Sequence, residues 1–179
     1  MIPTFFVLLC VVLRVIPHPP NFAPVGATAV FAGRTMKPWM AFVLVAAAMF
    51  LGDVILARLH GYPAVSLVTL FIYGGFFVQA ALGHALRSKK GGAIGAAVGG
   101  SVAFFVLSNF GVWVAGSLYP QTAAGLSACY VAALPFFGAT LAGDVIWTLV
   151  LSLAYRPLAA RLESREGWVP VPTRELAAV

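Results

Sequence analysis

The sequence predicts an all-α integral membrane protein, a helix bundle with about six transmembrane helices. Of its 179 residues, 61% are hydrophobic and only 9% are charged, and the mean hydropathy is +0.98. These values lie far from those of soluble domains, in which about a quarter of the residues are charged. The apolar residues also form long runs, and most of the basic residues stand between those runs. Composition, run length and charge placement therefore agree on a membrane protein.

Six hydrophobic runs supply the predicted helices, at about residues 2–16, 20–33, 39–56, 64–86, 93–118 and 130–155. The last four are long enough to cross a bilayer, which takes roughly 20 residues. The first is marginal, and it is expected to be a retained helix rather than a signal peptide because no basic residue precedes it and Arg14 follows it. The second would cover only about 21 Å as a helix. It is either a short span or a re-entrant segment.

Charge placement predicts the orientation. With six spans and both termini in the cytoplasm, the inner side would hold nine of the eleven basic residues, and Arg14 and Arg58 would lie outside. The nine are Arg34, Lys37, Arg87, Lys89, Lys90, Arg156, Arg161, Arg165 and Arg174. This distribution follows the positive-inside rule and indicates a multi-pass membrane protein with cytoplasmic termini. It argues against nucleic acid as a partner. Residues 1–157 would form the bundle, and residues 158–179 a polar cytoplasmic tail.

Small residues recur at helical spacing in two runs. Gly91, Gly95 and Gly99 are four residues apart, and Ala29 and Gly33 show the same spacing in the second run. Such faces let helices approach closely in lipid, so these faces are expected to pack within the bundle or against a partner protein. A phosphate-binding loop is excluded because no Gly-Lys-Ser/Thr sequence follows the glycines.

Two aspartates lie inside hydrophobic runs, each within the tetrapeptide Gly-Asp-Val-Ile. Asp53 is expected toward the outer side and Asp144 near mid-membrane. A carboxylate there costs roughly 2.5–3.5 kcal/mol, so such residues are usually functional. Asp53 either pairs with Arg14 as a structural ion pair or contacts a substrate. Asp144 is either a protonated or hydrogen-bonded packing residue, or part of a binding site or proton relay.

A short internal similarity raises the question of duplication. Asn21-Phe22 precedes the first Gly-Asp-Val-Ile, and Asn109-Phe110 precedes the second at a similar distance. A true repeat would give two halves of three spans each, inverted relative to one another, as in many transporters. Duplication and coincidence both remain open at this point.

The predicted outer loops, residues 17–24, 60–63 and 119–122, are rich in proline and aromatic residues. Proline stiffens a loop, so these segments are either simple turns or an outward-facing binding lid. Together with the intramembrane aspartates they define the predicted substrate-binding residues. These are Arg14, His18, Asn21, Asp53, Asn109, Trp113, Tyr119, Tyr130 and Asp144.

The sequence gives little support for catalysis. No histidine pair has metal-ligand spacing, and Cys10 and Cys129 fit neither a zinc motif nor a disulfide framework. Intramembrane aspartyl proteases carry Gly-x-Gly-Asp, but Phe50 and Leu141 replace the first glycine here. A protease dyad also needs its two carboxylates at equal depth. We therefore expect no enzymatic activity, no metal and no cofactor.

Longer motifs resemble a known family. They are Arg14-x-x-Pro-His-Pro-Pro-Asn-Phe-x-Pro-x-Gly-Ala, Ser108-Asn-Phe-Gly-Val-Trp and Tyr119-Pro-x-Thr-x-x-Gly-Leu-x-x-Cys-Tyr-x-x-Ala-x-Pro-Phe-Phe. Over about residues 14–155 the chain resembles a bacterial membrane family of predicted transport proteins, domain of unknown function 6580. That family is distantly similar to the S components of energy-coupling factor transporters. The similarity implies six helices, a vitamin-like solute bound from outside, a transmembrane coupling subunit and two ATPases.

The leading hypothesis is therefore a membrane-embedded protein for solute binding or uptake. The chain has no nucleotide-binding motif, so energy would come from partner subunits or from an ion gradient. Two alternatives stay open: a structural or assembly subunit without a ligand, and the intramembrane aspartyl protease.

Overall fold

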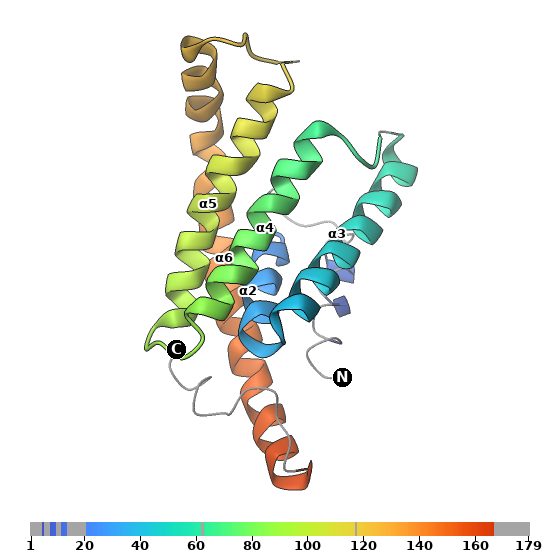
Figure 1. Ribbon diagram of the computed structural model, residues 1–179, viewed down its shortest axis with the longest axis vertical. Helices are drawn as coiled ribbons and strands as arrows, with labels where there is room; N and C mark the ends of the chain where they lie inside the picture. Colours follow the sequence, from blue (N-terminus) through green and yellow to red (C-terminus); the bar gives the residue numbers. More distant parts are fainter. Residues whose placement is uncertain are drawn as a thin grey trace.

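The computed structural model describes residues 5, 8, 9, 12, 13, 21–61, 63–116 and 118–166, with backbone only at 158 and 160–166. Its helices are α2 (Val25–Thr35), α3 (Pro38–His60), α4 (Leu67–Ala85), α5 (Gly92–Val114) and α6 (Ala123–Glu166). Figure 1 shows them as one bundle, and the described ranges contain no strand. Helices α3, α4, α5 and the Ala123–Pro157 part of α6 are long and apolar enough to cross a membrane. The predicted all-α bundle is confirmed for the described residues, and these four apolar helices suggest a membrane protein.

The predicted count of six spanning helices is not supported. Helix α2 has 11 residues, which cover about 16 Å and cannot cross a hydrocarbon core of about 30 Å alone. Every residue from Gly26 to Thr35 is buried, and α2 lies in the interior of the bundle among α3, α4, α5 and α6 (Figure 1). The run at 2–16 falls mostly outside the described residues; its five described positions are helical.

Local signals in the sequence set the helix ends. Pro38 occupies the first turn of α3, where a missing N–H costs nothing, and Gly61 ends this helix with a φ of 74°. Ser66 and Thr69 form a capping box at the start of α4. Helix α6 continues to Glu166, so it includes the first residues of the predicted tail at 158–179.

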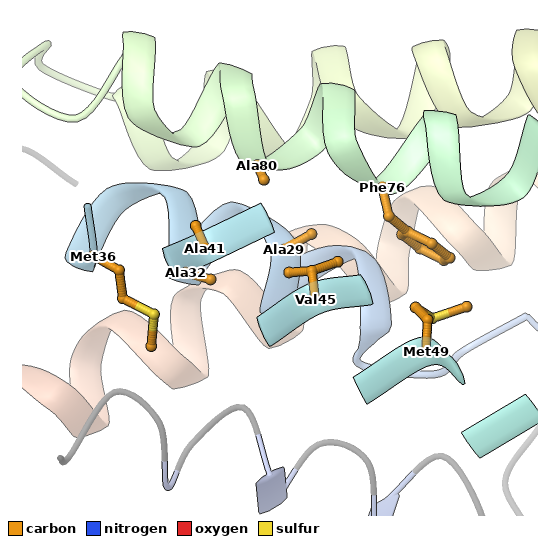
Figure 2. Packing of buried hydrophobic residues seen from close by; sticks show 8 residues of the cluster. All are labelled: Ala29, Ala32, Met36, Ala41, Val45, Met49, Phe76 and Ala80. Atoms are coloured by element: carbon orange, nitrogen blue, oxygen red, sulfur yellow. The ribbon is translucent and has the colours of Figure 1, made fainter. Parts of the chain in front are cut away.

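Helices α2 and α4 cross closely because glycines remove side chains from the contact. A Cβ on Gly33 would overlap the main-chain carbonyl of Ala80, and one on Gly83 would overlap that of Val30. Around this crossing, small and flexible apolar side chains of α2, α3 and α4 form a core (Figure 2). The small-residue face containing Gly33 therefore packs inside the bundle.

The glycine face of α5 behaves differently from that of α2. Ala93, Ala96 and Ala97 are fully buried, whereas Gly95 and Gly99 are exposed. The four-residue glycine pattern thus lies mostly on the outside of the bundle, and the residues that pack inward are the alanines beside it. An added Cβ would meet only a methyl group of Leu86 at Gly95, at 3.7 Å, or of Leu82 at Gly99, at 3.6 Å.

The basic turns share one end of the bundle. Figure 1 places the α2–α3 turn, the α4–α5 turn and the carboxyl-terminal part of α6 at one end, and the α3–α4 and α5–α6 connections at the other. Arg34 is not a surface residue at this end, because it is only 1% exposed. Its Nη1 donates to the carbonyl of Leu86 at 3.2 Å, joining α2 to the end of α4. We call the end that holds the α2–α3 and α4–α5 turns the basic end. The opposite end, with the α3–α4 and α5–α6 connections, is the connection end.

The predicted internal repeat is not supported either. Asn21 precedes the short helix α2, whereas Asn109 lies inside the 23-residue helix α5. The two Gly-Asp-Val-Ile segments also differ: Asp53 is half-buried in α3, and Asp144 is fully buried in α6. The equivalent sequence positions therefore do not occupy equivalent places.

Candidate functional site

The buried carboxylate of Asp144 gathers hydrogen bonds from three other helices. It is 3% exposed. Gln79 of α4 donates Nε2–H to its Oδ2 at 2.9 Å, and Ser101 of α5 donates Oγ–H to the same oxygen at 2.6 Å. The main-chain N–H of Ala27, in α2, is a further donor. No basic side chain takes part in this set of contacts, so the carboxylate is held by neutral donors.

Asp144 also serves as the N-terminal cap of α2. The N-cap position is Pro24, which offers no side-chain acceptor, and the first turn contains no acidic residue. The first N–H groups of a helix need acceptors, and the positive end of its dipole favours an anion. A carboxylate from α6 fills this need from across the bundle. Gly26 makes the approach possible, because a Cβ at this position would overlap Oδ1 of Asp144.

A cavity of about 220 Å³ lies against this carboxylate. Its walls come from all five described helices and the segment before α2. It is lined by Asn21, Ala23, Val25, Gly26, Met49, Ile72, Phe76, Gln79, Phe104, Thr140 and Asp144. A second cavity of about 200 Å³ shares Asn21, Phe104 and Thr140 with the first.

The position of the cavity follows from helix register. Ile72 and Phe76 lie nearer the connection end of α4 than Gln79 does, and Thr140 lies nearer the connection end of α6 than Asp144 does. The carboxylate and amide therefore form the floor of the cavity. The aromatic and apolar walls rise from that floor toward the connection end. The structure thus places a recess with a polar floor beside Asp144.

Gln79 carries the least satisfied polar atom of this floor. The residue is 0% exposed, and its Oε1 finds no hydrogen-bond partner within the described residues, although Nε2 is bonded to Asp144. A buried acceptor without a donor costs about 1–3 kcal/mol. Gln79 lines the cavity, so a ligand N–H or O–H that reached this oxygen would satisfy it.

Asp53 belongs to a different environment. Tyr73 of α4 donates its hydroxyl to Oδ2 of Asp53 at 2.7 Å, and both residues are half-buried. Tyr73 and Gln79 are six residues apart on α4, about 9 Å along the axis, so the aspartates bonded to them lie at different depths. Asp53 lines neither cavity. The predicted Arg14–Asp53 ion pair involves a residue outside the described part of the chain.

Because the Tyr73–Asp53 bond is half-buried, its removal should have a small effect. We expect Tyr73→Phe to lower the free energy of unfolding by about 1.5 kcal/mol, the lower end of the range for a hydrogen bond to a charged group. Thermal unfolding of the purified protein in one detergent measures this as a small fall in melting temperature. Asp53→Asn keeps an acceptor for the Tyr73 hydroxyl, so its melting temperature should fall less than that of Tyr73→Phe. A loss as large as that from truncating Asp144 would show that Asp53 has a greater role.

The other predicted site residues separate into three groups. Asn21 lines both cavities and Asn109 lines the second. Trp113 and Tyr130 line neither; their side chains donate to main-chain carbonyls, Trp113 Nε1 to Pro120 at 3.0 Å and Tyr130 Oη to Val106 at 2.8 Å.

Tyr119 lines neither cavity, and Arg14 and His18 fall outside the described residues. Two hydrogen bonds hold the loop at 119–122 to α5. The indole of Trp113 donates to the carbonyl of Pro120, and the side-chain amide of Gln121 donates to the carbonyl of Trp113. The loop is a fixed turn beyond the described cavities.

Four residues of the site were missed as candidates from sequence. Gln79 and Ser101 donate to Asp144, Gly26 admits it, and Phe104 forms a wall shared by the cavities. Gln79 carried a usable signal, since an amide in the middle of an apolar run is costly unless it has a partner. Gly26 and Phe104 carried none. Within the described ranges, no three His, Cys, Asp or Glu residues come close enough to share a metal ion.

Comparison with known proteins adds a family assignment. The chain belongs to a family of unknown function, DUF6580, whose model matches residues 1–165. No curated protein and no solved structure matches the chain.

Proposed function

We propose that this member of the DUF6580 family is an integral membrane protein that binds a small solute for uptake, with the ligand in the cavity above Asp144. The observation that carries the proposal is the cavity itself. A recess of about 220 Å³ has a buried carboxylate and a buried amide at its floor. Polar residues at membrane depth are expensive and usually mark a substrate pathway.

A structural role for Asp144 supports the competing proposal of an assembly subunit without a ligand. Capping α2 explains the contact of the carboxylate with Ala27, and the hydrogen bond from Ser101 ties α5 to α6. It does not explain the cavity above the cap or the unsatisfied Oε1 of Gln79. A residue needed only for packing would be expected in a filled interior, because protein interiors leave few voids larger than a water molecule. The solute-binding proposal accounts for both features.

The orientation proposed from the sequence extends to this bundle. The basic end carries Lys37, Arg87, Lys89 and Lys90 in or beside its turns, so we place it in the cytoplasm of a bacterial inner membrane by the positive-inside rule. The carboxyl terminus is then cytoplasmic, and the cavity lies in the outer half of the bundle. A cytoplasmic amino terminus requires in addition that the segment before α2 crosses the bilayer.

The likeness to S components of energy-coupling factor transporters extends the proposal to partners. In that arrangement the chain binds a vitamin-like solute, and a transmembrane coupling subunit with two ATPases drives transport. The alternative energy source is an ion gradient. The two are separated by uptake into proteoliposomes containing this chain alone. An ion-coupled carrier transports without ATPase subunits, whereas an S component binds solute but does not release it inside.

The test of solute binding uses two matched variants. Thr140 lines both cavities, so Thr140→Phe should fill them. Gly138 is exposed on the same helix and an added Cβ there meets nothing, so Gly138→Phe adds the same ring outside the cavity. We expect native mass spectrometry of purified wild-type protein to find a co-purified small molecule. It should persist in Gly138→Phe and be lost in Thr140→Phe.

Two results would contradict the proposal. One is a wild-type protein that carries no small molecule when it is released gently from the native membrane. The other is an adduct retained equally by Thr140→Phe, which would place the bound molecule elsewhere, as for a surface lipid. Both results would favour the assembly subunit.

A further inference from the structure

We infer that the solute is a small organic ammonium compound with a flat apolar group, rather than a carboxylate or phosphate. This inference rests on the proposed solute-binding function and specifies the ligand. It comes from the chemistry of the cavity lining, where hydrogen-bond acceptors and one negative charge meet aromatic walls.

The polar floor offers acceptors. Oε1 of Gln79 is buried without a donor, while Nε2 of the same amide is already engaged with Asp144. A carboxylate has about four lone-pair positions, and Asp144 uses three of them on Gln79, Ser101 and Ala27. An ammonium group, which has several N–H donors and no acceptor, can satisfy both the amide oxygen and the remaining carboxylate position.

The charge balance also favours a cation. None of the described residues lining the two cavities is Lys, Arg or His. The positive end of α2 contributes roughly half an elementary charge, which the full negative charge of Asp144 exceeds. Arg34 lies eight residues along α2 from Gly26, about 12 Å away, where it bonds to Leu86. An anionic solute would meet an uncompensated carboxylate and no cation.

The walls fit an apolar group. Phe76 and Phe104 lie against one another with ring centroids 4.8 Å apart, and Met49 and Ile72 complete the apolar surface. Aromatic faces attract ammonium groups as well as rings. A volume of about 220 Å³ is larger than a bare metal ion needs and below the range of about 300–1,000 Å³ typical of drug-sized ligands. The lining therefore selects a compact organic cation.

Three fragments with one ring and different charges test the inference: benzylamine, benzyl alcohol and benzoate. Their binding to purified wild-type protein is measured by saturation-transfer difference NMR. The Thr140→Phe protein in the same detergent corrects for partition into the micelle. We expect cavity-dependent binding in the order benzylamine, benzyl alcohol, benzoate. Asp144→Asn keeps the size of the side chain and should weaken benzylamine about tenfold, while benzyl alcohol changes little.

The results of these binding measurements can contradict the ammonium assignment without contradicting the proposed solute-binding function. Cavity-dependent binding of benzoate as tight as that of benzylamine would overturn the ammonium assignment and leave solute binding intact. Equal benzylamine affinity in wild type and Asp144→Asn would do the same. Failure of all three fragments would also overturn the inference, whereas the co-purified molecule sought by mass spectrometry judges the function independently. The wild-type comparison needs no variant of Asp144 to fold.

Discussion

Asp144→Ala should destabilise the bundle by about 2–4 kcal/mol, because it removes an acceptor and leaves its donors buried. Gln79 Nε2 and the main-chain N–H of Ala27 would lose their partner, at about 1–3 kcal/mol for each unsatisfied group. Ser101 would suffer less, since its hydroxyl also reaches the carbonyl of Ala97 at 2.9 Å. Thermal unfolding of the purified protein should show a clear fall in melting temperature.

The comparison with Asp144→Asn separates shape and capping from charge. The asparagine oxygen can still accept from Gln79, Ser101 or Ala27 but carries no charge. We expect it to recover most of the stability lost in Asp144→Ala while still binding ammonium fragments poorly. An alanine variant as stable as wild type would show that α2 does not depend on this carboxylate for its N-terminal cap.

The four long helices α3 to α6 could be predicted from sequence, although the total of six spans could not, because lipid imposes a simple rule on long apolar runs. A chain crossing hydrocarbon must satisfy its backbone within each segment, so a long apolar run means a helix. The predicted runs at 39–56, 64–86, 93–118 and 130–155 correspond to α3, α4, α5 and α6. The length of helix α2 could not be predicted in this way. The other helices surround α2, so its length need not match the thickness of the bilayer.

The site was only half predictable for a related reason. An ionisable residue in an apolar run is conspicuous, so Asp144 was identified from its cost in lipid. Its donors lie 43 and 65 residues earlier in the chain, and no local pattern indicates that Gln79 and Ser101 meet it. The same reasoning gave Asp53 equal weight, yet tertiary packing places it beside a tyrosine hydroxyl and away from the cavity. Sequence shows which groups are costly; helix packing decides what satisfies them.

A change in the spacing between α2 and α4 should lower stability as much as a change in the polar floor of the cavity. We expect Gly33→Ala to lower the free energy of unfolding by about 3 kcal/mol or more, because its Cβ would overlap the main-chain carbonyl of Ala80. Overpacking usually costs about 1–3 kcal/mol, and a backbone obstacle cannot rotate away as a side chain can. Since α2 also carries Gly26 and Ala27 to the cavity floor, moving it should weaken solute binding together with stability.

Gly95→Ala is the matched control. Gly95 is exposed on α5, and an added Cβ would meet only a Leu86 methyl group at 3.7 Å, an ordinary contact. Alanine is the better helix former by about 1 kcal/mol, so this change should leave the melting temperature unchanged or raise it. Size-exclusion chromatography and thermal unfolding in one detergent compare the two variants. If Gly33→Ala were as stable and monodisperse as Gly95→Ala, the close α2–α4 crossing would not be what holds α2 inside the bundle.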